Sequence, residues 1–520
     1  MSQRPGKQQD RAVKSPAEPE HDASELPEGW GKCRVGEVFK ISSGGTPSRT
    51  ESRYWNGNVP WLSSGDIKTD EIEVGTEFIT EAGLQNSTAK LCEPGAVVVV
   101  VRSGVLKHTL PVAVLRRPAA INQDLKCFDS GSKDLNRWLA LALKASTHLI
   151  LAENREGTTV QSVKSETLRE FELPLPPLAE QRRIVAKLEE LLGKVSSSQQ
   201  RLSRVPGLLK RFRQSVLAAA CSGRLTADWR EQNPDAIPAT PSVQPGKSSQ
   251  AARASDECIL GDSGLSVGDC GQDAPAKWTW TKLTDVARLE SGHTPSRTHP
   301  EYWDGPIAWV GIKDARNHNG LVIKDTIQHV TELGLANSAA RLLPANTVCL
   351  TRTANSIGYS LILGREMATS QDLVGWVCTD AIEPRYLMTL FLAEHDALYR
   401  FARGSAHPTA YFPEILAFHA CLPPLAEQHE IVHQVEKLFA FADQIEARLT
   451  QAQTHVSRIT QSLLAKAFRG ELVPTEHALA TAARRDYESA SALLARVQTK
   501  QQTTAATIKP KRRQKAAKQG

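Results

Sequence analysis

Two arginines stand where a side chain could reach into a nucleic-acid groove. Arg102 follows an apolar run that predicts a strand, and Arg352 stands at the equivalent place in the second half of the chain. The guanidinium fork suits both phosphate oxygens and the guanine edge. Small polar or basic residues follow each arginine, and the candidates among them are Lys107, His108, Asn355 and Ser356. Pairing of either arginine with a local carboxylate is the competing interpretation.

A Gly/Pro turn that occurs twice is the second candidate. It reads S-G-G-T-P-S-R-T from Ser43 to Thr50 and S-G-H-T-P-S-R-T from Ser291 to Thr298. Hydroxyls and backbone donors in such a turn can hold phosphate, although ordinary turn chemistry accounts for the same residue types. Together with one glutamine further along each half, these candidates are Ser43, Thr46, Ser48, Arg49, Gln123, Ser291, Thr294, Ser296, Arg297 and Gln371.

Tryptophans accompany both turns. Trp55 and Trp61 in the first half match Trp303 and Trp309 in the second. Aromatic side chains can stack on bases, but matched large aromatics are more often part of a core. We therefore expect them in the core.

Catalytic motifs are missing from the sequence. The stretch ending in Gly246-Lys247-Ser248 has Pro241 where a phosphate loop requires glycine, and no H-E-x-x-H, dinucleotide-binding or Asn-Pro-Pro-aromatic motif occurs. The nine cysteines form no C-x-x-C pair, which predicts reduced cysteines without a disulfide framework or zinc site. The sequence thus predicts no catalytic residue and no metal ligand, and favours a binding protein.

Composition fits a soluble protein. Of the 520 residues, 40% are hydrophobic and 23% charged, and the net charge of +6 permits nucleic-acid binding without demonstrating it. The apolar runs are too short to span a bilayer, and the polar N-terminus lacks the apolar segment of a signal peptide. We expect a soluble, cytoplasmic protein.

An internal duplication organises the chain. The turn motif recurs 248 residues later, and five further motifs follow in the same order at offsets between 247 and 251, including L-P-P-L-A-E-Q from Leu175 and again from Leu422. Each copy begins with about 150 residues of short β-rich runs and Gly/Pro turns, typical of a mixed α/β domain. A long helical pattern follows the Pro-Pro pair of each copy.

The helical patterns have the spacing of coiled coils. Apolar residues alternate steps of four and three over more than four heptads in both copies, which predicts a buried seam. Pro206 predicts a kink or short break in the first helix, and that helix is markedly basic. The residues expected at the seam and at subunit interfaces are Ile184, Leu188, Leu191, Leu202, Phe212, Ile431, Val435, Leu438, Ile445, Leu449 and Ile459.

These features predict an α+β protein with two mixed α/β domains, each followed by a long helix, and the two repeated helices can pair with each other. The expected segments are a disordered N-terminus (1–25), domain 1 (26–173), a central helix (174–225), a linker (226–276), domain 2 (277–420), a C-terminal helix (421–473) and a basic tail (474–520).

The motif set as a whole resembles the specificity subunit of type I restriction–modification systems. The resemblance rests on G-G-T-P-S, Y-W-x-G, N-Q-D-L, P-L-P-P-L-A-E-Q-R-R-I-V and S-G-R-L in this order, and it covers about 450 residues. Three features depart: His293 replaces Gly45, Ser370 replaces Asn122, and the Pro206-Gly207 break makes the first helix less regular than the second.

The resemblance implies a non-catalytic subunit that binds double-stranded DNA. The two mixed α/β domains would be target recognition domains, separated by two long helices that form an antiparallel coiled coil. Each recognition domain would read one half of a split target, while the helices set the spacer and dock methyltransferase subunits. A restriction–translocase subunit can join, and S-adenosylmethionine and ATP with Mg²⁺ would be used by the partners, so this chain binds no cofactor. Two alternatives remain open at this point: a coiled-coil scaffold that binds only proteins, and a methyltransferase or nuclease with a fused recognition part.

Overall fold

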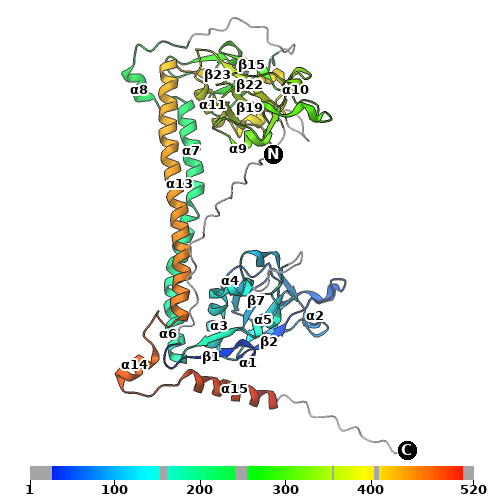
Figure 1. Cartoon of the computed structure of the whole chain (residues 1–520), viewed down its shortest axis with the longest axis vertical. Coiled ribbons are helices and arrows are strands. Elements are labelled where there is room, and N and C mark those ends of the chain that lie inside the picture. Colours follow the sequence, from blue (N-terminus) through cyan, green and yellow to red (C-terminus); the bar gives the residue numbers. More distant parts are fainter. Residues whose placement is uncertain (1–25, 153–160, 240–253, 354–355, 403–408, 508–520) are drawn as a thin grey trace, which may run out of the picture. The chain divides into compact units, whose positions relative to one another are not determined.

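The computed structural model describes residues 26–152, 161–239, 254–353, 356–402 and 409–507. The chain divides into two compact units, the first made of Met1–Gln200 and Gln453–Gly520 and the second of Arg201–Ala452. Each unit combines a sheet-containing domain with helical segments (Figure 1). The expected disordered segment 1–25 lies outside the described residues.

A five-stranded sheet forms the centre of the first unit. Its order is β2 (Lys40–Ser43), β10 (Leu125–Asp129), β7 (Val97–Val100), β8 (Val112–Leu115) and β4 (Glu71–Ile72). Neighbouring strands are antiparallel except β4 and β8. All four valines of β7 are buried, which explains why this stretch of sequence is apolar throughout instead of alternating.

The second unit repeats this sheet strand for strand. Its order is β15 (Ala287–Ser291), β22 (Leu373–Cys378), β19 (Val348–Thr351), β20 (Ser360–Leu363) and β17 (Val322–Ile323). The last pair is again parallel and the others are antiparallel. The predicted duplication is therefore confirmed at the level of topology.

A smaller sheet in each unit carries the tryptophan pairs. In the first unit it consists of β5 (Glu77–Ile79), β3 (Trp55–Leu62), β9 (Ala119–Ile121) and β6 (Leu91–Cys92). In the second unit it consists of β18 (Gln328–Val330), β16 (Trp303–Val310) and β21 (Ala368–Thr369). Both β3 and β16 shift register after their first tryptophan.

The expected linker 226–276 is wrong in part. It contains helix α8 (Ala227–Gln232) and strands β12 (Ile259–Leu260) and β13 (Leu265–Val267), which join β23 (Phe418–Leu422) and β14 (Thr279–Lys282) in one sheet. All three residues of β13 are buried. Burial against β23 overrides the loop-like Gly/Ser composition of this stretch.

The cysteine prediction also needs correction. Cys258 and Cys270 form a disulfide, while the seven other cysteines are free thiols. The β12–β13 hairpin folds the chain back on itself and so brings these two cysteines together, although their separation of 12 residues matches no disulfide pattern that the sequence suggested.

Three helices follow the heptad patterns. The first pattern is split into α6 (Leu178–Leu202) and α7 (Val205–Cys221), and the second forms the single helix α13 (Leu425–Phe468). The break lies immediately before Pro206, as predicted. In the second unit α7 and α13 run antiparallel. Thr226, which follows α7, bonds Glu427 at the start of α13, and Arg213 in the middle of α7 bonds Asp443 further along α13.

The repeated L-P-P-L-A-E-Q motif builds the start of each long helix. Gln181 Nε2 donates to the Pro176 carbonyl at 2.7 Å, and Gln428 Nε2 donates to that of Pro423 at 3.0 Å. Glu180 and Glu427 are fully buried, and each accepts a hydrogen bond from a tryptophan indole, at 2.9 and 3.0 Å respectively. Burial raises the pKa of Glu180.

Most of the residues expected at the seam are buried or half-buried. Ile184 and Leu188 in the first unit, and Ile431, Val435 and Leu449 in the second, are buried, while Leu191, Phe212, Leu438 and Ile445 are half-buried. Leu202 is only half-buried because α6 ends there. Ile459 is 37% exposed.

The expected basic tail is folded over much of its length. It contains α14 (Glu476–Ala483) and α15 (Ala490–Thr507). Leu493 and Val497 are buried in the core of the first unit, so this part of the expected tail is a packed helix. The lysines and arginines from 509 onward lie outside the described residues. In the described part of the chain, every helix is too short or too polar to cross a bilayer.

Candidate nucleic-acid interface

Close backbone packing fixes the repeated turn. A side chain at Gly44 would collide with the Ile121 carbonyl, and one at Gly292 with the Ser370 carbonyl, so each turn requires glycine at this point. Gly45 donates its backbone N–H to Ile121 at 2.9 Å, and His293 does the same to Thr369 at 2.8 Å. The two turns therefore sit in the same way on their sheets.

The replacement of Gly45 by His293 has a steric explanation. A Cβ atom at Gly45 would collide with the side chain of Thr88. The residue at the position of Thr88 in the second copy is Ala339. The smaller alanine leaves room for a side chain in that turn, so the backbone path is preserved.

The two tryptophans of each pair donate hydrogen bonds to backbone carbonyls of their turn. Trp61 and Trp55 donate their indole N–H groups to the carbonyls of Gly45 and Ser48, both at 3.0 Å. The corresponding bonds of Trp309 and Trp303 measure 3.1 and 3.2 Å. The two rings of each pair meet edge to face, with centroids 5.2 and 5.3 Å apart. The core expectation is confirmed for Trp61 and Trp309, whereas Trp55 and Trp303 are half-buried.

An arginine lies over the half-buried tryptophan of each pair. The guanidinium carbon of Arg49 is 3.8 Å from the centroid of Trp55, and that of Arg297 is 4.0 Å from Trp303. Stacking on the ring limits the positions that the guanidinium can take. The serine and threonine on either side of each arginine share a hydroxyl hydrogen bond of 2.8 Å.

The partner of this arginine differs between the copies. Arg49 binds the Glu77 carboxylate through two bonds of 2.5 and 2.8 Å. Arg297 instead donates to the amide oxygen of Gln328 at 3.0 Å. The hydrogen bond from Arg49 lowers the pKa of Glu77, so this pair is ionised and its charges cancel. The second turn keeps the positive charge of its arginine.

The two candidate glutamines hydrogen-bond to the turns. Thr46 donates its hydroxyl to Gln123 at 2.6 Å, and Thr294 donates to Gln371. Ser43 accepts a bond of 2.5 Å from Lys126 on the neighbouring strand. In each domain the turn thus contacts a glutamine that lies 77 residues further along the chain than the threonine it bonds.

The two strand-end arginines are not equivalent. Arg102 is exposed, and its backbone N–H donates to the Asp124 carbonyl at 3.3 Å, next to Gln123. Lys107 and His108 are exposed nearby, at the end of the short helix η2 (Gly104–Lys107). Among the ion pairs within the described ranges, none involves Arg102.

Arg352 is anchored instead. Its Nε donates to the Gln371 carbonyl at 3.1 Å, and its guanidinium carbon lies 4.8 Å from the Phe412 centroid. Burial lowers the pKa of Arg352. Ser356 is wrong as a surface candidate, since it is buried and donates its hydroxyl to the Thr353 carbonyl at 2.6 Å. Asn355 lies outside the described residues.

Sequence reasoning missed Glu77, Gln328 and Thr88. Neither glutamate nor glutamine at this position belongs to a motif, and each becomes visible only through the turn that it contacts. A signal was nevertheless present, because Glu77 and Gln328 occupy matching places in the two copies and differ in charge.

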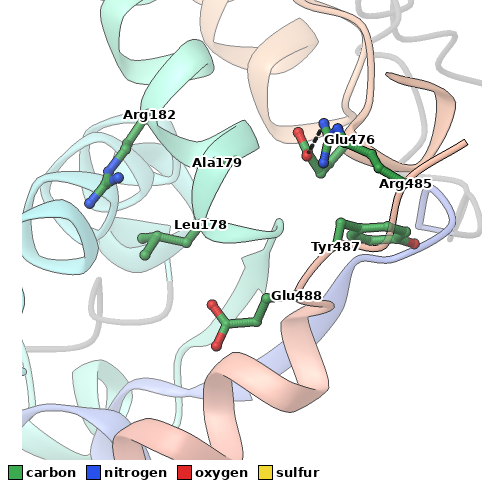
Figure 2. A pocket seen from close by; sticks show the side chains of 7 residues that line it. All are labelled: Leu178, Ala179, Arg182, Glu476, Arg485, Tyr487 and Glu488. Atoms are coloured by element: carbon green, nitrogen blue, oxygen red, sulfur yellow. Dashed lines mark hydrogen bonds and ion pairs between the residues drawn. The ribbon is translucent and has the colours of Figure 1, made fainter. Parts of the chain in front are cut away.

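A pocket of about 260 Å³ lies elsewhere in the first unit, between the start of α6 and the C-terminal segment. Figure 2 shows Leu178 and Arg182 on one side and Glu476, Arg485 and Glu488 on the other. Its charges are already paired: Arg182 with Asp134, Glu476 with Arg183 and Arg485, and Glu488 with Arg496. Such a pocket offers no free charge to an anion. Among the described residues no group of three metal-ligating side chains occurs.

Comparison with known sequence families decides what kind of protein this is. The type I restriction modification DNA specificity domain matches the chain twice, at residues 27–206 and 275–453. The chain belongs to the family of type I restriction–modification DNA specificity subunits. The two matches coincide with the two copies found by internal comparison.

Individual relatives agree with this assignment. The EcoBI specificity subunit of Escherichia coli is 30% identical over 366 residues, which cover 68% of this chain and 70% of the relative. The EcoDI specificity subunit, also of Escherichia coli, is 25% identical over 473 residues, covering 86% and 90%. A chain from a structural study of assembly and conformational transition in the type I R–M system has the same fold, with a TM-score of 0.61 at 18% identity, covering 86% and 99%.

Membership in the specificity-subunit family resolves the alternatives that the sequence left open. Subunits of this family determine DNA specificity and are not the catalytic subunits of their complexes. The fused methyltransferase or nuclease is therefore wrong, as is the scaffold that binds only proteins.

Proposed function

We propose that each recognition domain of this specificity subunit reads one half of a split DNA target through the surface built around its G-T-P-S-R turn. The observation that carries this proposal is the turn itself. It occurs twice with the same hydrogen bonds and the same arginine–tryptophan stack, yet in different electrostatic surroundings. Two turns with the same backbone geometry but different partners of their arginine are suited to two different half-sites.

The side-chain chemistry of the surface supports DNA as the ligand. Exposed hydroxyls, a glutamine amide and a guanidinium can serve phosphate oxygens and base edges. In domain 1 the exposed Arg102, Lys107 and His108 add a second basic group beside Gln123. Arg352 holds the Gln371 backbone and acts there as a positioning residue in domain 2.

The long helices would set the distance between the half-sites and bind methyltransferase subunits. Because the seam residues are buried within the chain, partners would contact the outer flanks of the helices. Methyl transfer with S-adenosylmethionine, and ATP- and Mg²⁺-dependent translocation by a restriction subunit, would belong to those partners. The present chain supplies DNA specificity.

A binding experiment on the assembled complex tests this proposal. Duplexes with either half-site scrambled are titrated against complexes that carry the wild-type chain or Arg102→Ala. We expect Arg102→Ala to weaken binding by about 1–3 kcal/mol on duplexes that retain the first half-site, and to change nothing on duplexes that lack it. Equal losses on both kinds of duplex, or no loss, would contradict the assignment of this surface.

A further inference from the structure

An aspartate in each recognition domain fixes one position on the surface close to the repeated turn. Asp314 is buried, and its carboxylate accepts the backbone N–H of Ile327 at 3.0 Å. In the first domain Asp66 accepts the backbone N–H of Thr76, also at 3.0 Å. The same hydrogen bond therefore holds Ile327 and Thr76 in their domains.

The loops that lead to this position differ in length, but the position itself is the same. Ile327 follows its aspartate by 13 residues, whereas Thr76 follows its aspartate by 10. In each copy the next residue along the chain pairs with the second tryptophan of the neighbouring strand, Trp61 or Trp309. Thr76 and Ile327 are therefore equivalent, although the loop of the second domain is longer.

Both neighbours of Ile327 are anchored as well. Gln328 is the residue whose side chain accepts the hydrogen bond from Arg297 of the turn, at 3.0 Å. On the other side, the Thr326 hydroxyl accepts the backbone N–H of Trp309 at 3.1 Å and donates to the Gln328 carbonyl at 2.7 Å. The backbone around Ile327 is thus fixed next to the partner of the turn arginine.

The side chain at this position is apolar in one domain and polar in the other. Ile327 is 61% exposed, and the equivalent Thr76 is exposed too. A single exposed isoleucine is common on protein surfaces, so its exposure alone indicates nothing. Here, however, the exposed side chain projects from a fixed backbone beside a surface that we propose to read DNA. This combination indicates contact with an apolar group of the DNA.

We propose that Ile327 contacts the C5-methyl group of a thymine in the half-site that domain 2 reads. This methyl is the apolar group that an A·T pair presents in the major groove, and apolar side chains recognise it there. Thr76 has a hydroxyl that can bond a base edge, so the two domains would differ in base preference at this point. The inference rests on the proposed function and names a specificity-determining residue with the group that it recognises.

Deoxyuridine tests this contact, because it pairs with adenine as thymidine does and lacks only the C5-methyl group. The methylated motif of the host supplies the duplex, and each thymine of both half-sites is replaced in turn. The half-site of domain 2 is the half that changes when residues 277–420 are exchanged for those of a relative. Dissociation constants are measured for the assembled complex.

Three chains are compared in this complex: wild type, Ile327→Ala and the matched control Ile237→Ala. Ile237 is 79% exposed and lies outside both segments that match the specificity domain. Circular dichroism on heating verifies that each chain is folded.

We expect one deoxyuridine in the half-site of domain 2 to raise the dissociation constant of the wild-type complex about fourfold, equivalent to about 0.8 kcal/mol for one methyl group. The same replacement should change the dissociation constant of the Ile327→Ala complex by less than about 1.5-fold, because the partner of the methyl group is gone. The Ile237→Ala complex should respond as the wild type does.

An equal loss at that thymine in the wild-type and Ile327→Ala complexes would overturn the inference. A domain 2 half-site without an A·T pair, or one in which no deoxyuridine weakens wild-type binding, would also overturn it. In these cases the complex still binds its motif, so the proposed function stands. A wild-type complex that binds the motif no better than a scrambled duplex would contradict the proposed function and the inference together.

Discussion

Arg49 and Arg297 have the same geometry but different charge environments. The carboxylate of Glu77 neutralises Arg49, whereas Gln328 offers Arg297 only an amide oxygen. An arginine that contacts a phosphate contributes about one released counterion to the salt dependence of binding. If these arginines face DNA, the second domain should depend on its turn arginine and the first should not.

The exchange of these partners is the most direct test at the residue scale. Gln328→Glu should lower the salt slope of DNA binding by about one and weaken binding, because the added carboxylate neutralises Arg297. Glu77→Gln should raise the slope by about one. Each variant controls for the other, since both keep the size of the side chain. Salt titrations of the assembled complex give the slopes, and identical slopes for wild type and both variants would show that the turn arginines do not contact phosphate.

The turn surface could be predicted from the sequence because repetition marked its residues. Serine, threonine, arginine and glutamine candidates of both copies lie together, and two of the four tryptophans are buried as expected. The exceptions have physical reasons: Ser356 is drawn into a buried hydrogen bond, and Arg352 stacks on Phe412. The stacking of Arg352 has no sequence signal, since Phe412 is 60 residues away in the chain.

At the scale of elements, periodicity predicted the long helices, whereas composition did not reveal the elements within 226–276 and 474–520. Heptad spacing located α6, α7 and α13, and Pro206 marked the break. Strand β13 was missed because three residues are too few to show a pattern, and its stability comes from pairing with β23. Helices α14 and α15 were missed because the segment was described by its charges alone, whereas its apolar residues Leu493 and Val497 pack into the core.

The seam gives a stability prediction. Leu188 is fully buried in the core of the first unit, so Leu188→Asp would place an unpaired carboxylate there and should cost several kcal/mol, on the order of 3–5 kcal/mol. Ala186→Asp, an exposed change on the same helix, should cost less than about 1 kcal/mol. Thermal unfolding followed by circular dichroism compares the two. Similar melting curves for both variants would refute the seam position of Leu188.

For the whole molecule, the proposal that the helices set the spacer predicts the effect of lengthening them. One heptad is inserted after Arg213 in α7 and one after Ala442 in α13, at the level where Arg213 binds Asp443. A heptad preserves the seam phase and adds about 10 Å. The gap between half-sites should grow by about three base pairs at about 3.4 Å per base pair.

The bases of each half-site should remain the same in this extended protein, because the recognition domains are untouched. Because DNA is helical, the added base pairs also rotate one half-site relative to the other about the DNA axis, so DNA binding by the extended complex should be weaker. Methylation mapping in cells that carry the extended chain measures the spacer. Retained methylation with the original spacer would show that the helices do not measure the gap.

The central claim, that each domain reads one half of a split target, is tested most directly by methylation sequencing of the host genome. Three strains are compared: one with the chain, one without it, and one with a hybrid whose residues 277–420 come from a relative. The account predicts a split methylated motif that disappears without the chain and that, in the hybrid, keeps one half and the spacer while the other half changes. A motif that survives the loss of the chain, or a hybrid that changes both halves, would contradict it.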